Sequence, residues 1–195
     1  MSGTLRFRTD LIDTPIGKLL LVADHSGNLR SAGWIEDEAD VLHQLRTHYG
    51  ADGFELESSH NPHGLSDALR NYFAGELNAI DRIAVETGGT PFQREVWREL
   101  RKIPCGTTIS YAKLAQRVGR PNAVRAVGLA NGSNPVPIVV PCHRVIGSDG
   151  SLTGYGGGIE RKRWLLQHEK CTGLATQSSL LDHARPVQLT RAARR

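Results

Sequence analysis

The sequence has no long hydrophobic run and only three cysteines in 195 residues. Apolar runs such as residues 138–140 are far shorter than the ~20 residues that a membrane-spanning helix needs, so we expect no membrane segment. Residues 1–8 contain no apolar signal region, which favours a cytoplasmic location. None of the cysteines belongs to a CxxC motif or to a Cys/His pair at metal-ligand spacing, so we expect neither a disulfide framework nor a structural zinc site.

The histidines also lack the spacing of a metal site. Five of them are scattered among expected loops and helices of the N-terminal half, without cysteine or carboxylate partners. We interpret them as surface side chains, and we expect no metal and no other cofactor. They are His25, His43, His48, His60 and His63.

Charge is distributed unequally along the chain. Residues 1–90 contain seven Lys and Arg against 14 Asp and Glu, a net charge of −7, whereas residues 91–195 contain 17 against six, a net charge of +11. These opposite signs indicate two units, of which only the second is attracted to nucleic-acid phosphates. An ordinary basic surface is the alternative interpretation.

Short apolar segments separated by turn residues predict a sheet in the N-terminal half. Two amphipathic helical segments follow the strands. We expect an antiparallel sheet with helices and no catalytic constellation, so we interpret this half as a scaffold. The expected strands are residues 5–11, 17–24 and 29–34, and the expected helices are residues 38–49 and 66–74.

Capping residues predict a series of helices after a linker at residues 86–89. The run Thr90-Pro91-Phe92-Gln93 combines an N-cap, a proline at the first helical position and a capping-box glutamine, so a helix should continue to about Arg101. Two shorter helices, at residues 111–118 and 122–130, are separated by a tight turn that contains glycine. This order is typical of a helix-turn-helix unit.

The second of these shorter helices has a surface of small residues. Ala123, Ala126, Gly128 and Ala130 would let it approach DNA closely, and Arg125 is its only charge. Because the helix lacks the long polar side chains that read base edges in the major groove, we expect sequence-tolerant binding. An Arg125 that merely contacts phosphate is the simplest interpretation of that side chain.

A candidate nucleophile and its base are adjacent in the run Val139-Val140-Pro141-Cys142-His143-Arg144-Val145-Ile146, at the end of an expected short strand. A neighbouring imidazole can lower the pKa of a thiol or take its proton. Adjacent strand residues point to opposite faces, so Cys142 and His143 can cooperate only if the chain turns, which Pro141 favours, or if a water bridges them. The alternative is a small buried cysteine next to a core histidine.

Loops rich in glycine and proline flank this pair, at residues 131–138 and 153–158. Such loops let backbone groups approach a flat ligand closely. In this setting, the run of residues 141–145 resembles the signature of the O6-alkylguanine-DNA alkyltransferases, also called methylated-DNA–protein-cysteine methyltransferases. The resemblance extends from about Thr90 through Glu169, and the N-terminal half is more weakly similar to the bacterial constitutive form.

The resemblance implies an α+β fold, in which an N-terminal ribonuclease-H-like domain of a sheet plus helices precedes a mainly helical winged helix-turn-helix domain. The implied ranges are 1–88 for the scaffold domain and 89–171 for the domain of DNA binding and alkyl transfer. Residues 172–195 end in basic residues and show no convincing hydrophobic period, so we expect a disordered basic tail.

The same resemblance implies DNA repair by irreversible transfer of a methyl or larger alkyl group from O6 of guanine, and from O4 of thymine, to Cys142. Water does not displace a thioether at useful speed, so each molecule would act once. The implied partner is double-stranded DNA, bound through the minor groove with the damaged nucleotide flipped out. No cofactor, membrane or obligate protein partner is implied, and the protein would be a monomer.

Several catalytic roles come from the resemblance alone. It assigns His143 to deprotonate Cys142 through a water, and Glu169 to orient His143 and stabilise its charge. It also assigns Lys162 as a nearby cation. On spacing alone, Glu169 and Lys162 would be solvated helix charges.

The resemblance further assigns Asn134 to tie the active-site loop together, Tyr111 to donate a hydroxyl to the base, and Arg125 to fill the base stack as a finger. The DNA would also meet Ala123, Ala126, Gly128 and Tyr111. The implied pocket residues are Asn131, Pro137, Val145, Tyr155, Gly156 and Gly157. Because Gly156 offers only a backbone amide to O6, we expect room for alkyl groups larger than methyl.

Three other functions fit parts of the pattern. A Cys-His-Glu hydrolase or acyltransferase would turn over many times, unlike a protein that is spent by its own reaction. A non-catalytic module that binds alkylated DNA would not need Cys142. A transcription regulator of the same family would carry an additional N-terminal cysteine-rich module, which this sequence does not contain.

Overall fold

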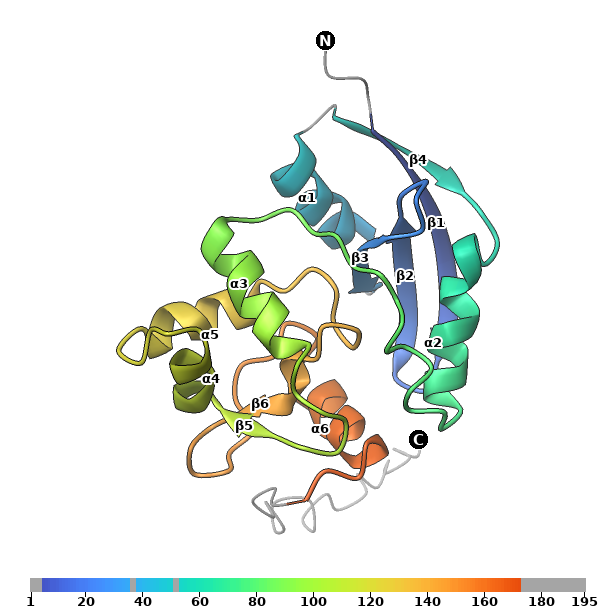
Figure 1. The fold of residues 1–195 in the computed structure, drawn as a ribbon. Coiled ribbons are helices and arrows are strands. Elements are labelled where there is room, and N and C mark those ends of the chain that lie inside the picture. Colours follow the sequence, from blue (N-terminus) through green and yellow to red (C-terminus); the bar gives the residue numbers. More distant parts are fainter. Residues whose placement is uncertain (1–4, 36–37, 51–52, 173–195) are drawn as a thin grey trace, which may run out of the picture.

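The computed structural model describes residues 5–35, 38–50 and 53–172. It has an α+β fold, in which a four-stranded sheet and its two helices precede a mainly helical half (Figure 1). The expected tail at residues 172–195 lies, apart from its first residue, outside the described residues. No helix in the described part is long and apolar enough to cross a membrane.

The sheet is mixed, with the strand order β3-β2-β1-β4. β1 (Leu5–Thr14), β2 (Gly17–Ala23) and β3 (Leu29–Trp34) pair antiparallel, as the sequence predicts. β4 (Phe54–Ser58) was not expected, and it pairs parallel to β1, so the prediction of a purely antiparallel sheet was wrong. The long connection that a parallel pair requires runs from β1 through β2, β3 and α1 (Glu38–Tyr49) to β4.

The two faces of the sheet have different partners. Along β2, Leu20 and Val22 belong to a small cluster with Leu45 of α1, whereas Leu19 and Leu21 belong to the main core. This alternation follows from the two-residue period of a strand. α2 (Leu65–Phe73) joins the main core on the second face, and Figure 1 shows α1 and α2 on opposite sides of the sheet.

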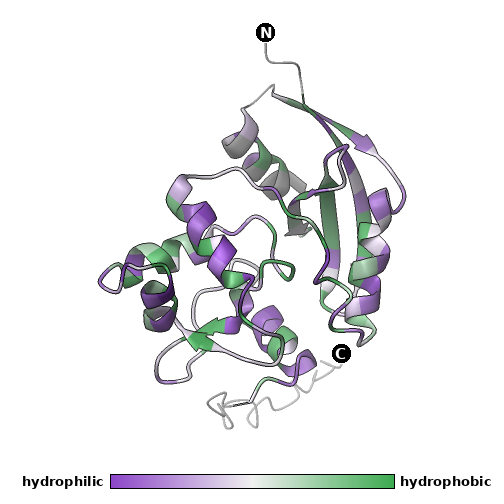
Figure 2. Cartoon of the chain, viewed as in Figure 1, coloured by the Kyte–Doolittle hydropathy of each residue, from purple (hydrophilic) through white to green (hydrophobic). Residues whose placement is uncertain are grey.

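The second half begins with α3 (Pro91–Leu100), whose capping box is formed as predicted. The backbone amide of Gln93 donates to Thr90 Oγ1 at 3.2 Å, and the amide of Thr90 donates to Gln93 Oε1 at 2.8 Å. Its apolar face is buried, whereas its outer face is hydrophilic (Figure 2).

The expected helix-turn-helix is present as α4 (Tyr111–Arg117) and α5 (Val124–Gly132). Ser110 caps α4 by accepting from the amide of Lys113 at 3.1 Å. α5 starts two residues later than predicted, because the turn continues through the bond from the amide of Ala123 to the carbonyl of Arg120. Beside these helices, β5 (Ile109–Ser110) pairs parallel to β6 (Val145–Ile146), and α6 (Ile159–His168) follows.

The apolar segment at residues 136–140 is not the strand that its composition predicts. Pro135 and Pro137 have no amide hydrogen for a ladder, and Ile138 adopts a φ of 76°. The segment instead forms tight local bonds, such as that from the amide of Val140 to the carbonyl of Val136 at 2.9 Å. It leads into the short 3-10 helix η2 (Cys142–Arg144).

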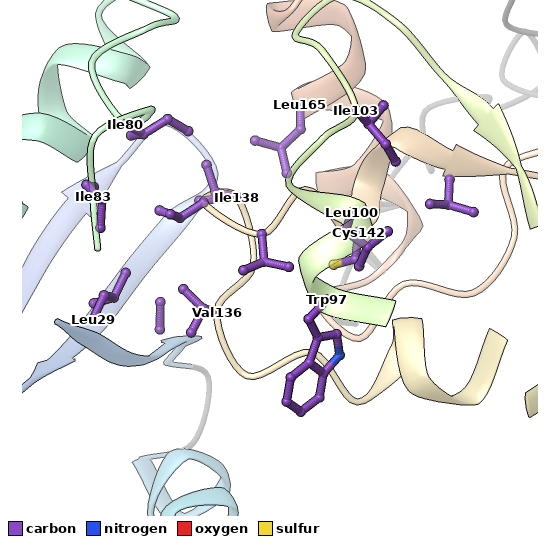
Figure 3. Close-up of a cluster of buried hydrophobic side chains, with 14 of the residues drawn as sticks. Leu29, Ile80, Ile83, Trp97, Leu100, Ile103, Val136, Ile138, Cys142 and Leu165 are labelled. Atoms are coloured by element: carbon purple, nitrogen blue, oxygen red, sulfur yellow. The ribbon is translucent and has the colours of Figure 1, made fainter. Parts of the chain in front are cut away.

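One continuous core joins the two halves. Leu29 and Ile83 from the N-terminal half lie in the same cluster as Val136 and Leu165 from the C-terminal half (Figure 3). The packing therefore shows no gap at the expected boundary between residues 88 and 89, and that boundary stays a prediction.

Candidate active site

The turn at η2 determines where the candidate nucleophile and base point. The amide of Cys142 donates to the carbonyl of Val140 at 2.8 Å, and the amide of Arg144 donates to the carbonyl of Pro141 at 3.0 Å. Cys142 is 5% exposed and His143 is fully buried. The chain thus turns at this pair, and the Cys142 side chain lies close to Trp97 and Leu100 of α3 (Figure 3).

Asn134 ties the preceding loop together. Its Nδ2 donates to the carbonyl of Val140 at 2.7 Å, and its Oδ1 accepts from the amide of Val136 at 3.1 Å. The side chain of Asn131 donates to the carbonyl of Cys142 at 3.5 Å. These bonds satisfy backbone groups that the prolines of the loop leave without ladder partners.

The Cys142 thiol is held mainly in its protonated form. Burial raises its pKa above the ordinary value, and hydrogen bonding with Asn134 and the charge of Lys162 offset part of that rise. Because the thiolate is the nucleophilic form of cysteine, the site needs a group that can take the thiol proton.

His143 is neutral, which is the form of histidine that can accept a proton. Burial lowers its pKa, although the hydrogen bond and charge of Glu169 oppose that change. Its Nε2 lies 3.0 Å from Oε1 of Glu169, and a carboxylate only accepts, so Nε2 carries the ring proton. The other nitrogen, Nδ1, then presents a lone pair, and it has no hydrogen-bond partner among the described residues.

Glu169 is an ionised carboxylate inside the protein. Burial alone would raise its pKa, but hydrogen bonds from His143 and Arg144, and the charge of Arg144, hold that pKa well below its usual range. Arg144 donates Nε to Oε2 at 2.7 Å and Nη2 to Oε1 at 2.8 Å. This two-pronged pair fixes the carboxylate plane.

Lys162 is also enclosed. Its Nζ donates to the carbonyls of Val145 and Thr153, both at 2.7 Å, and lies 5.9 Å from the centre of the Tyr111 ring. Burial lowers the pKa of Lys162 to about 8, with a Cys142 thiolate opposing that change.

The interpretation of Glu169 and Lys162 as solvated helix charges was therefore wrong, because both are buried. The two positions share one face of α6 with Leu165 and Leu166, at the three- and four-residue spacing of a buried stripe. That spacing is the signal that could have identified them as buried.

Tyr111 connects α4 to the glycine-rich loop at residues 153–158. Its hydroxyl donates to the carbonyls of Thr153 at 3.1 Å and Gly154 at 3.3 Å. Burial raises its pKa, so the hydroxyl keeps its proton. A Cβ on Gly128 of α5 would lie 3.8 Å from the Tyr111 ring, so that glycine packs beside the tyrosine.

The glycine-rich loop is built differently at neighbouring positions. A Cβ on Gly157 would come within 2.7 Å of the Trp34 ring, whereas a Cβ on Gly156 would lie 3.6 Å from the nearest atom, the carbonyl oxygen of Gly132. Burial and the charge of a Cys142 thiolate raise the pKa of Tyr155 well above its ordinary value. Of the other expected pocket residues, Val145 is fully buried and Pro137 is half-buried.

Arg161 links this loop to the N-terminal half, although no sequence motif singles it out. Its Nε donates to the carbonyl of Ile16 at 2.8 Å, and its Nη1 donates to the carbonyl of Gly157 at 3.0 Å. The guanidinium also lies 4.9 Å from the centre of the Trp34 ring. The turn between β1 and β2 is thereby attached to the loop beside Cys142.

An open depression of about 720 Å³ lies where this loop meets the start of α6. Residues 156–158, Ile16 and Trp164 contribute to its lining. Cys142 and His143 do not line it, so this depression does not reach the candidate nucleophile.

α5 presents the expected candidates for DNA contact unequally. Arg125 and Ala126 are exposed, Ala123 and Gly128 are half-buried, and Ala130 packs inward. Leu129, which the sequence analysis did not single out, is 77% exposed one turn after Arg125. Among the described residues, no group of three or more His, Cys, Asp or Glu side chains could hold a metal.

Fold and site together define a class of protein, in which a helix-turn-helix half contains a buried cysteine, histidine and carboxylate. Comparison with sequence profiles identifies the family within this class. Residues 7–87 match the family described as "6-O-methylguanine DNA methyltransferase, ribonuclease-like domain", and residues 91–171 match "6-O-methylguanine DNA methyltransferase, DNA binding domain". The chain belongs to the 6-O-methylguanine DNA methyltransferase family.

Individual relatives agree with this assignment. A protein of Shigella flexneri named methylated-DNA–protein-cysteine methyltransferase is 54% identical over 165 residues, which cover 85% of this chain and 96% of the relative. One of the same name from Mycobacterium tuberculosis is 48% identical over 166 residues, covering 85% and 93%. The solved M. tuberculosis OGT in complex with DNA matches with a TM-score of 0.68 and 45% identity, covering 85% of this chain and 93% of that one.

Proposed function

We propose that this protein repairs DNA by transferring an alkyl group from O6 of guanine directly to Sγ of Cys142. The observation that carries the proposal is the buried relay in which Glu169 holds Nε2 of His143 and leaves Nδ1 without a partner among the described residues, in the residue that follows the buried Cys142. Membership of the family, and relatives named for methyl transfer to a protein cysteine, support the same reaction.

The chemical step balances without a cofactor. His143 Nδ1 takes the Cys142 proton through a water, and the thiolate attacks the alkyl carbon in line with its bond to O6. The new S–C bond forms as the C–O6 bond breaks, and the guanine receives the electron pair. The proton returns from His143 to the guanine, so the products are an S-alkylcysteine and an unmodified base.

One buried cation favours the attacking thiolate, and a tyrosine hydroxyl and backbone groups contact the guanine. Lys162 lies near Cys142, and its positive charge favours the thiolate. The Tyr111 hydroxyl keeps its proton and stands at the glycine-rich loop, where it would turn from the carbonyl of Thr153 to donate to the base. In this proposal the carbonyls of Cys142 and Val145 accept from the guanine amino group, and the amide of Gly156 faces O6.

The DNA partner is proposed to bind through its minor groove along α5. The exposed, small surface at Ala126 and the neighbouring Ala123 and Gly128 permit close approach of the backbone. Arg125 would fill the base stack when the damaged nucleotide turns out, at a cost of roughly a few kcal/mol that is lowest for a mispaired base. Such binding requires one copy of the chain, so we propose a monomer.

The reaction is proposed to be single-turnover, because water does not displace a thioether. The test is a duplex that carries radiolabelled O6-methylguanine, incubated in molar excess over the protein, followed by peptide mass mapping. We expect one added CH2 group per molecule, on Cys142 and not on Cys105 or Cys171. Repeated turnover, or label on another cysteine, would remove the proposal.

A matched variant separates binding from chemistry. Cys142→Ala should abolish transfer and keep DNA affinity, because the exposed basic surface is unchanged. If Cys142→Ala still removed the methyl group, a different nucleophile would be responsible.

A further inference from the structure

A tyrosine of the N-terminal half reaches the carboxylate of the proposed relay. Tyr72 belongs to α2, its side chain is fully buried, and its hydroxyl lies 2.8 Å from Oε1 of Glu169. The two residues are 97 positions apart in the chain. The half that sequence analysis treats as a scaffold therefore contacts the relay directly.

The position of Tyr72 is fixed at both ends. Its backbone carbonyl lies 2.7 Å from Nε2 of His168, at the end of α6. Its ring packs edge-on against the rings of Phe73, at 5.3 Å, and His168, at 5.2 Å. The hydroxyl cannot leave Glu169 without moving one of these contacts, so the hydrogen bond is part of a rigid interface between α2 and α6.

The direction of this hydrogen bond is determined by charge. Burial and the negative charge of Glu169 raise the pKa of Tyr72 far above its ordinary value, so the phenol keeps its proton and donates it. Oε1 thus receives three donors, namely His143 Nε2, Arg144 Nη2 and the Tyr72 hydroxyl. Each additional donor lowers the charge that Oε1 offers to the other two.

We propose that Tyr72 is a positioning residue for alkyl transfer, whose hydroxyl holds Glu169 in place and weakens its pull on the His143 proton. The inference rests on the proposed function. The Tyr72 hydroxyl adds to the effect of burial, which lowers the pKa of His143, and so helps the histidine to keep a lone pair for the Cys142 proton. Without the hydroxyl, Glu169 would stabilise the imidazolium more strongly.

The other charges around the relay do not change when the hydroxyl is removed. Glu169, Arg144 and Lys162 face His143, and the latter two lower its pKa. Around Glu169, burial and, after it, the charge of Glu169 raise the pKa values of the Cys105 and Cys171 thiols, so both stay neutral. Loss of the Tyr72 hydroxyl therefore raises the pKa of His143 and moves the acidic limb of the pH–rate profile to higher pH.

The experiment is the pH dependence of single-turnover methyl transfer in Tyr72→Phe, with saturating duplex. The expected result is a rate about three- to tenfold below wild type on the acidic limb, converging at alkaline pH, with unchanged DNA affinity. Tyr49→Phe is the matched control, because it removes a largely buried hydroxyl from the same half, in the separate cluster around Phe7. It should leave the pH profile unchanged.

A second measurement keeps the inference testable if Tyr72→Phe folds poorly. Replacement of Tyr72 by 3-fluorotyrosine gives a stronger donor of nearly the same shape, and it should move the acidic limb to lower pH. Where Tyr72→Phe folds, the same substitution in a Glu169→Gln background should have no additional effect on the profile.

A Tyr72→Phe profile that overlays wild type, or an equal effect with and without Glu169, would overturn the inference. Failure of the proposed function looks different, because wild type would then transfer no methyl group to Cys142 at any pH.

Discussion

Lys162 is a cationic side chain enclosed by protein, and its ionisation should be visible in the stability of the fold. Folding lowers its pKa from 10.5 to about 8, so between these values the unfolded chain binds more protons than the folded one. The free energy of unfolding contributed by Lys162 therefore rises with pH through that window.

We expect Lys162→Met to lack this rise. Urea denaturation of both proteins at several pH values from 7.5 to 10 measures it. Equal slopes of unfolding free energy against pH in the two proteins would contradict the burial of the charged amine.

Gly156 and Gly157 are adjacent, and they provide a matched pair for the packing of the glycine-rich loop. Alanine at 157 would place Cβ 2.7 Å from the Trp34 ring, whereas alanine at 156 would meet its nearest atom at 3.6 Å. We expect Gly157→Ala to destabilise the protein by about 1–3 kcal/mol and Gly156→Ala to have little effect. Denaturant midpoints measure the difference, and equal midpoints would show that the loop moves away from Trp34 freely.

The relative rates of transfer for small and large alkyl groups test whether Gly156 determines the size of the pocket. Because Gly156 has no side chain, butyl adducts should react within about tenfold of methyl adducts, a barrier difference of about 1.4 kcal/mol. Gly156→Leu should increase that ratio in a competition between methyl- and butyl-adducted duplexes. A ratio that does not change would show that another residue limits the pocket.

At the scale of an element, α5 joins the proposed DNA surface to the candidate active site. Its N-terminal part exposes Arg125 and Ala126, while Asn131, near its end, contacts the carbonyl of Cys142. A perturbation on the outer face of α5 can therefore be separated from one at the nucleophile.

Arg125→Ala should slow repair of duplex substrate far more than reaction with the free alkylated base, because only the duplex requires a nucleotide to be turned out. Single-turnover rates on both substrates measure this. Arg120→Ala is a suitable control, since that exposed cation lies before α5 and contacts Phe92 and Glu95. If Arg125→Ala slows the reaction of both substrates by the same factor, the Arg125 side chain does not fill the base stack.

The elements that the sequence predicts are those with strong local signals. α3 has its complete capping box at residues 90–93, and β1–β3 alternate or run apolar between clear turns. β4 is an edge strand whose residues are almost all exposed, and the alternation Phe54-Glu55-Leu56-Glu57 is a short signal of period two that could have predicted it. Residues 136–140 have a strand's composition, but Pro137 within the segment and Pro135 directly before it lack the amide donors that a strand needs.

The residues of the site also fall into two groups, those that the local sequence identifies and those that contact the site from distant positions in the chain. Cys142 and His143 are adjacent, and the resemblance to a family identified their distant partner Glu169. Tyr72 and Arg161 are joined to the site through contacts that span 97 and 145 residues, and no local pattern encodes such contacts.

At the scale of the whole molecule, the side chains of the described residues lead us to expect a reaction that needs no metal. No cluster of ligands is formed there by the scattered histidines, and the proposed step uses only the chain's own acids and bases. Transfer should therefore survive treatment with EDTA at an unchanged rate. Loss of activity with EDTA and recovery with added zinc would show that a metal was overlooked.

The core that runs through both halves also constrains how this chain can be divided. Neither half encloses its apolar surface alone, since Leu29 and Ile83 pack in one cluster with Val136 and Leu165. A protease cut in the connection near residue 88 should yield two fragments that remain associated and melt together in one transition. Expressed separately, each fragment should aggregate, and mixing them during refolding should recover transfer to Cys142.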